Sequence, residues 1–182
     1  MDITTNREII WERIKSGGPT SVIVSNKEEK VKFVPNFLKV FKKELSVNKI
    51  IPICIDCEQI SSSFMFFKEI FFSIWNLITP ENKERFELFK DAIETANETS
   101  TLDAIMENFM SMVKKDMNIN LLLILDNFDT SVADFEEPDL MKIRGMSCHV
   151  NMLTVTTSSL EMLAIENQKE DYYCNQFKAF IV

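Results

Sequence analysis

Glycine is scarce in this sequence, with three residues in 182. Gly17 and Gly18 are adjacent and Gly145 stands alone, so no segment has the run of glycines that lets backbone N–H groups wrap around a phosphate group. Internal repeats and low-complexity linkers are also lacking. The length suits one domain with a hydrophobic core, and we expect residues 1–182 to form a single domain.

Histidine and cysteine, the usual ligands of transition metals, are few as well. The four cysteines are too few for a disulfide scaffold, and a reducing compartment would keep them as thiols. Cys54 and Cys57 form a C-x-x-C pair on or just after an expected strand, where residues three apart face opposite sides, so we expect neither zinc binding nor redox chemistry. His149 is the only histidine, and we expect it in a surface turn.

No apolar run reaches the roughly 18–20 residues of a membrane span, and the N-terminus lacks the basic and apolar regions of a signal peptide. We therefore expect a cytoplasmic protein with no membrane partner. The formal net charge of −8 makes nucleic acid an unexpected partner too. Lys39, Lys42 and Lys43 are the one basic cluster, and their spacing fits a solvated helix face.

The pattern of apolar residues predicts alternating helices and strands. Helices are expected at residues 6–16, 31–45, 61–78, 81–96, 101–115 and 136–144 and from Leu160 onward, and strands at residues 21–24, 50–55, 121–125, 151–157 and 177–182. Residues 25–30 read as a polar turn, and Pro35 is expected in the first turn of its helix. Short, wholly apolar strands alternating with helices indicate an α/β three-layer sandwich, in which helices flank a mostly parallel sheet on both faces.

Ligands of parallel sheets bind beyond the carboxyl ends of the strands, so the polar residues that follow each strand are the candidates for a site. Three segments qualify: residues 25–32, 126–129 and 156–159. An aspartate at the tip of a buried strand can hold a magnesium ion against phosphate oxygens, and Asp126 has that position. Aspartate also starts turns and caps helices, which is the structural alternative for Asp126.

The order of elements resembles the AAA+ and STAND classes of P-loop ATPases, especially bacterial and archaeal ATP-binding proteins related to origin-recognition ATPases. Residues 121–129, LLLILDNFD, resemble their Walker B segment, and residues 151–159, NMLTVTTSS, resemble their sensor-1 strand. The resemblance covers nearly the whole chain. It implies a P-loop NTPase-like core, with ATP and magnesium as the cofactors of an active member and Asp126 as the magnesium ligand.

The chain departs from this family in its phosphate-binding loop. A Walker A loop needs glycines, a lysine for the β- and γ-phosphates and a hydroxyl for magnesium, and residues 25–33, SNKEEKVKF, contain no glycine. Neither alignment restores the motif. One alignment puts Val31 at the lysine position and Lys32 at the hydroxyl position. Moving it by one residue puts Lys32 at the lysine position, but Val31 then replaces the glycine and Phe33 replaces the hydroxyl. Glu28 and Glu29 add negative charge where a triphosphate would lie.

Two further departures concern hydrolysis. Asn127 stands where the family has the second Walker B acid, and an amide does not accept a proton as a carboxylate does. The sequence also ends where the helical lid of the family would begin, so we expect no lid domain.

These observations predict a degenerate P-loop ATPase-like domain, a pseudoenzyme that acts as a structural or protein-interaction module. No cofactor is expected, and the expected partner is a protein or a second copy of the chain. The alternatives are an active or nucleotide-binding AAA+/STAND ATPase, in which Lys30 or Lys32 replaces the usual lysine, and the core half of a split STAND protein. If a nucleotide binds, the candidate contact residues are Ser25, Asn26, Lys27, Lys30, Lys32, Asp126 and Thr157.

Overall fold

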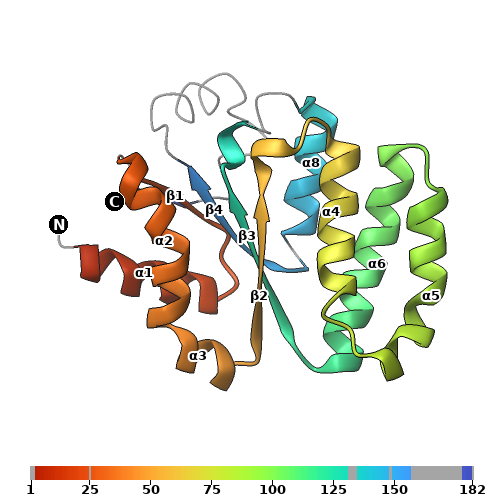
Figure 1. Cartoon of the computed structure of the whole chain (residues 1–182), viewed down its shortest axis with the longest axis horizontal. Helices are drawn as coiled ribbons and strands as arrows, with labels where there is room; N and C mark the ends of the chain where they lie inside the picture. The colour runs from red at the N-terminus through yellow and green to blue at the C-terminus, as the bar shows by residue number, and fades with distance from the viewer. Residues whose placement is uncertain (1–2, 25, 131–134, 148, 157–177, 182) are drawn as a thin grey trace.

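A five-stranded parallel sheet forms the centre of the molecule (Figure 1). The computed structural model describes residues 3–24, 26–130, 135–147, 149–156 and 178–181. The strands are β1 (Thr20–Ile23), β2 (Ile50–Asp56), β3 (Asn120–Asp126), β4 (Asn151–Thr156) and β5 (Lys178–Ile181), in the order β2-β3-β4-β1-β5. All four pairings are parallel, which confirms the predicted fold class.

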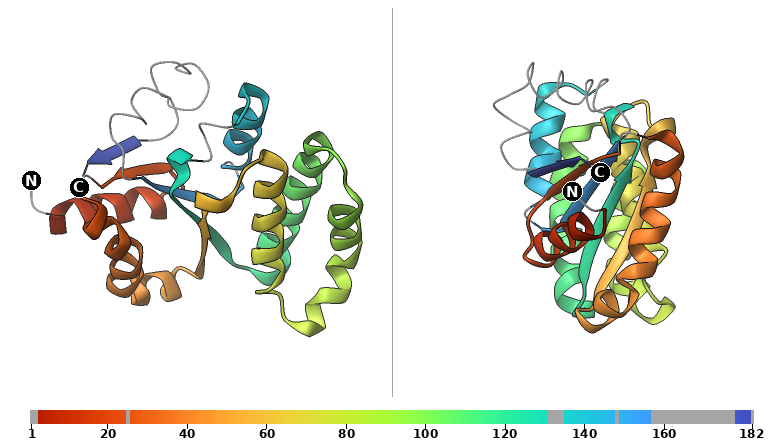
Figure 2. Two further views of the ribbon diagram at one scale, coloured as in Figure 1. Left: turned by 45° about the horizontal axis from the view of Figure 1, so that its top comes forward. Right: turned by 90° about the vertical axis from the view of Figure 1, so that its left-hand side faces the viewer.

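Helices cover both faces of this sheet (Figures 1 and 2). One face carries α1 (Ile3–Lys15), α2 (Lys27–Val40) and α3 (Lys42–Val47), and the other carries α4 (Ser63–Trp75), α5 (Pro80–Thr95), α6 (Thr99–Met117) and α8 (Glu137–Met146). A short 3₁₀ helix, η1 (Cys57–Gln59), joins β2 to the segment before α4. Successive strand residues point to opposite faces, so strands covered on both sides are apolar throughout.

Strand β3 illustrates this arrangement. Leu121, Leu123 and Leu125 pack with the α4 and α6 side of the core, whereas Leu122 and Ile124 pack with the α1 and α2 side. All five are buried. The polar residue that follows this apolar run, Asp126, is thereby fixed at the carboxyl edge of the sheet, on the same face as Leu122 and Ile124.

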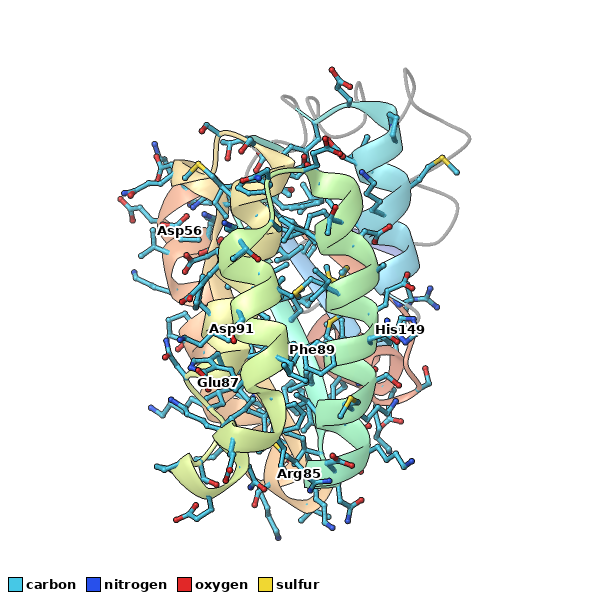
Figure 3. The ribbon with its side chains drawn as sticks, turned by 90° about the vertical axis from the view of Figure 1, so that its right-hand side faces the viewer. Asp56, Arg85, Glu87, Phe89, Asp91 and His149 are labelled. Carbon is cyan, nitrogen blue, oxygen red and sulfur yellow. The ribbon has the colours of Figure 1, made fainter. Side chains whose placement is uncertain are left out.

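Phenylalanine side chains hold the second helical layer together. The ring centroids of Phe71 on α4 and Phe109 on α6 are 4.5 Å apart, and Phe86 on α5 meets Phe109 edge-on at 5.8 Å. Figure 3 shows Phe89 between α5 and α6, with Glu87 and Asp91 on the outer side of α5. The deep packing expected for the phenylalanine-rich α4 is therefore confirmed.

The start of α2 differs from the prediction. Residues 25–30 were expected to form a turn, but α2 begins at Lys27, because the side chain of Asn26 accepts a hydrogen bond from the Glu28 N–H at 2.9 Å and caps the helix. Glu28 and Glu29 then lie in the first turn, where negative charge complements the helix dipole. Pro35 consequently lies inside the helix and not in its first turn, so that prediction was wrong.

The remaining element boundaries differ by a few residues. The helix expected at residues 31–45 is divided at Phe41 into α2 and α3, and α4 ends at Trp75, three residues earlier than expected. The helix expected from Leu160 lies outside the described residues. Within the described part of the chain, no helix is both long and apolar enough to cross a membrane.

Two leucines test this division between core and surface. Leu102 on α6 is 0% exposed and Leu88 on α5 is 82% exposed. We expect Leu102→Ala to lower the free energy of unfolding by about 2–5 kcal/mol, because it leaves a cavity, and Leu88→Ala to change it by less than about 0.5 kcal/mol. Urea denaturation followed by circular dichroism measures both, and equal effects would contradict the packing described here.

Candidate functional site at the carboxyl edge of the sheet

The candidate site lies where β2 and β3 end. Their parallel register pairs Asp56 with Asp126, so two strand tips deliver carboxylates side by side. On the other half of the sheet, β1 and β4 end together, with Ile23 opposite Thr156. The first turn of α2 brings a lysine to Asp126 at the tip of β3.

Lys30 is the cation of the site. Its side chain is 6% exposed, and its Nζ lies 2.8 Å from Oδ1 of Asp126, whose side chain is 30% exposed. Lys30 also donates a hydrogen bond to Oδ1 of Asn127. The buried ammonium is thus held by a carboxylate and an amide, the partners that a buried positive charge requires.

Asn127 extends these contacts to the neighbouring strand. Its backbone N–H donates to Oδ1 of Asp126 at 3.0 Å, and its side-chain Nδ2 donates to Oδ1 of Asp56 at 2.8 Å. One amide side chain therefore accepts from Lys30 and donates to Asp56. A carboxylate here could not donate to Asp56, since an ionised acid has only acceptor oxygens.

The backbone conformation at Asn127 also suits asparagine. Its φ is 57°, in the left-handed region that asparagine adopts more readily than most residues do. This turn aims the amide back toward Asp56 and lets the main-chain N–H reach Asp126. Asn127 thus lies where the sequence resemblance places the catalytic acid, and its contacts are those of a bridging residue.

Asp56 is held in its ionised form. The hydrogen bond from Asn127, the backbone N–H of Glu58 at 3.1 Å and the charge of Lys30 lower the pKa of Asp56 below its usual value. The lowered pKa stabilises the fold above the ordinary pKa of aspartate, and this contribution is lost as the pH falls through the lowered value. Asp56, Asp126 and Lys30 together carry one more negative than positive charge near neutral pH.

The other predicted contact residues that the structure describes do not join this network. Asn26 caps α2, and Lys27 and Lys32 are exposed on the same helix. Among the described members of the predicted set, only Lys30 and Asp126 are brought together, and Lys30 rather than Lys32 is the lysine that faces the strand tips. Ser25 and Thr157 lie outside the described residues.

The connection between β1 and α2 is short. Strand β1 ends at Ile23 and α2 begins at Lys27, so three residues separate them. A Walker A motif places four residues between its two glycines before the lysine, which gives its loop the length to surround phosphate groups. Residues 27–32, which the sequence analysis assigned to this loop, are helical instead.

The C-x-x-C pair is separated as expected. Cys54 is exposed at β2, whereas Cys57 is buried in the core on the α4 side. Partial burial of the thiol, together with the charge of Asp126, raises the pKa of Cys54, which keeps it protonated and poorly nucleophilic. Among the described residues no group of three or more histidine, cysteine or acidic side chains is placed to hold a metal ion. His149 lies in a half-exposed turn.

Asp56 was missed by sequence reasoning, which ended its strand at Ile55. The signal was present: residues 50–56 and 120–126 are both seven-residue strands that end in aspartate. Aligning the two strand ends would have predicted paired carboxylates. The contact of Lys30 could not be found this way, because it depends on where α2 begins.

Comparison with solved structures identifies proteins with the same fold. The chain superposes on the ORC2 protein of Aeropyrum pernix, solved with ADPNP and ADP, with a TM-score of 0.71, covering 98% of this chain and 46% of that one at 12% identity. The ORC1 protein of the same organism, solved in complex with DNA, gives 0.64, covering 97% and 44% at 10% identity. Cdc6p of Pyrobaculum aerophilum gives 0.59, covering 96% and 43% at 10% identity.

These likenesses establish the fold, which resembles that of the AAA+ P-loop ATPase core. The chain spans a little less than half the length of each of these proteins. No protein-family model matches the sequence, and no curated protein matches it.

The ion pair of Lys30 yields a stability prediction. Lys30→Met removes the cation that faces the partly buried Asp126, so we expect the free energy of unfolding to fall by about 1–3 kcal/mol. Lys32→Met, at an exposed position of the same helix, is the matched control and should change it by less than about 0.5 kcal/mol. Chemical denaturation of the two variants checks this, and equal losses would rule out a special role for Lys30.

Asn127 yields a prediction about ionisation. Asn127→Gly keeps the positive φ accessible while removing the side chain that donates to Asp56. We expect the pKa of Asp56 to rise toward the ordinary value of an aspartate, without reaching it while the Glu58 N–H remains bonded. An NMR titration of the Asp56 side-chain carbon measures the shift, and an unchanged pKa would contradict the bridge.

Proposed function

We propose that this chain is a non-catalytic P-loop-like domain that has lost ATP hydrolysis and tight nucleotide binding and acts as a structural or protein-interaction module. The observation that carries the proposal is the closed contact of Lys30 with Asp126 and Asn127. In an active P-loop site the lysine faces phosphate oxygens and the aspartate serves magnesium. Here the two side chains neutralise each other.

The N-terminus of α2 also supports the loss of nucleotide binding. A helix end binds anions through its free backbone N–H groups, and the Glu28 N–H is already bonded to the side chain of Asn26 at 2.9 Å. Glu28 and Glu29 are exposed in the first turn of α2 and would repel phosphate groups. The connection of three residues before α2 adds too little backbone to enclose a triphosphate.

Hydrolysis has a separate requirement that the site does not meet. A base or water-positioning group must take up the proton of the attacking water. At the position of the expected acid, Asn127 offers an amide whose oxygen faces Lys30 and whose NH₂ group faces Asp56. Both the oxygen and the NH₂ group of this side chain are therefore already hydrogen-bonded within the protein.

One observation favours the alternative of nucleotide binding. The hydroxyl of Thr156 is buried and has no hydrogen-bond partner within the described part of the chain, at the same edge of the sheet as Asp126. On this alternative Lys30 would release Asp126 and turn to a phosphate group, and Asp126 would hold magnesium. The similarity to the ORC2 protein, which was solved with ADPNP and ADP, would then extend from the fold to the ligand.

The third possibility is the core half of a split protein, which the apolar run at residues 179–182 suggests. In the described chain Lys178–Ile181 form β5, which pairs with β1 in the same sheet. The backbone groups of β5 that face β1 are hydrogen-bonded within the chain, which favours an interaction module over a half-domain. DNA, which one of the similar proteins binds, remains an unexpected partner because of the net charge of −8.

Calorimetric titration with MgATP tests the proposal. We expect no binding up to about 1 mM nucleotide and no phosphate release above buffer. Asp126→Ala and Lys30→Met should leave both results unchanged. Micromolar binding that either substitution abolishes, with Lys32→Met as the unaffected control, would establish the nucleotide-binding alternative, and turnover with the same dependence would establish an ATPase.

A further inference from the structure

Strand β2 is one edge of the sheet, and its outer side is not paired with another strand in the described part of the chain. Figure 1 shows it as the strand nearest the viewer, with α2 and α3 on one side and α4 on the other. Exposed edges offer free backbone N–H and C=O groups to any extended chain, and a proline is a common way to blunt them. Pro52 stands in the first half of this strand.

The outward groups of β2 can be assigned from its pairing. The Asn120 N–H donates to the Lys49 C=O at 2.9 Å, and the parallel register pairs Ile50 with Asn120. Backbone groups of successive residues alternate between the two sides of a strand, so those of Pro52, Cys54 and Asp56 face outward. Pro52 removes one outward donor, and the N–H groups of Cys54 and Asp56 remain beyond it.

A pocket of about 380 Å³ lies beside these free groups. It is lined by Cys54, Ile55, Asp56, Gln59, Ile60, Met65 and Glu69. Cys54 and Asp56 point to the α2 face of the sheet and Ile55 to the α4 face, so a pocket touching all three lies at the outer edge of β2. The second half of β2, which lacks proline, therefore has this pocket next to the outward N–H groups of its backbone.

The apolar residues of the lining lie on the α4 face of the pocket, and one acidic residue lies on each face. Ile55, Ile60 and Met65 supply apolar surface, and the Met65 residue is 48% exposed. Asp56 and Glu69 are the only charged residues in the lining, and the lowered pKa of Asp56 keeps its carboxylate ionised. The pocket therefore favours a chain that combines apolar and cationic side chains, and disfavours an acidic one.

We propose that the β2 edge binds an extended basic peptide segment of another protein, which adds a strand beside Cys54–Asp56. Side chains of an extended peptide alternate between its two faces, so lysine or arginine residues would meet Asp56 while apolar residues meet Ile55, Ile60 and Met65. The net charge of −8 opposes a second copy as the occupant. This inference rests on the proposed function in that it names a partner for an interaction module.

The probe is a fluorescein-labelled heptapeptide, Ac-KVKVKVK-NH₂, whose alternation matches the two sides of the pocket. We expect saturable binding with a Kd on the order of 100 μM in fluorescence anisotropy, and none for Ac-EVEVEVE-NH₂. Glu69→Gln removes one of the two negative charges of the pocket lining and should weaken binding about threefold. Glu84→Gln, at an exposed position of α5, is the control and should leave binding unchanged. Absence of binding by the lysine peptide would overturn the proposal.

Backbone pairing is tested separately from charge attraction. Two versions of the peptide, N-methylated on odd or on even residues, carry the same charge, but only one keeps its N–H groups toward β2. We expect only one version to bind, and equal binding of both would overturn strand addition. Cys54→Pro removes an outward donor, as Pro52 already does, and should abolish binding while thermal unfolding confirms that the chain is folded.

Two outcomes separate this inference from its alternatives. Concentration-dependent dimers in sedimentation that Cys54→Pro dissociates would overturn the peptide proposal in favour of self-pairing through β2. Nucleotide binding is measured in its own titration, so the peptide can bind whether or not MgATP does. Failure of the peptide alone would leave the loss of nucleotide binding untouched.

Discussion

The ammonium group of Lys30 constrains everything at the carboxyl edge of this sheet. A cation whose side chain is only 6% exposed must be neutralised within the protein, and Asp126 supplies the charge at 2.8 Å. This contact fixes the first turns of α2 against β3. It also determines the role of Asn127, because the amide that completes the coordination of Lys30 is the one that donates to Asp56. Two strands and one helix are therefore joined through two side chains, those of Lys30 and Asn127.

Under the proposed function, this arrangement would let an ATPase-like fold persist without a bound nucleotide. In a working site, phosphate groups and magnesium satisfy the lysine and the aspartate. Here protein groups satisfy them, so the fold does not need a bound nucleotide to neutralise its own charges. A nucleotide would have to break this ion pair and come close to the negative charge of Asp56 before any phosphate contact formed.

Most of the fold could be predicted from the sequence, and the reason is physical. Strands buried on both faces are apolar throughout, so β3 and β4 were evident, and the phenylalanines of α4 indicated deep packing. The start of α2 could not be predicted from periodicity, because residues 27–30 are polar and helical through the cap of Asn26 and the acidic first turn. That misplaced boundary also concealed the pairing of Lys30, since a residue in a loop has no defined facing direction. Asp126 was predicted from its strand tip, whereas Asp56 required the register between two strands.

A double-mutant cycle between Lys30 and Asp126 measures this central interaction most directly. Unfolding free energies of Lys30→Met, Asp126→Asn and the combined variant give the coupling between the two side chains. The account predicts a coupling of about 1 kcal/mol or more, with the double variant less destabilised than the sum of the two single ones. Additive losses would mean that the two charges do not depend on each other, and would contradict the account.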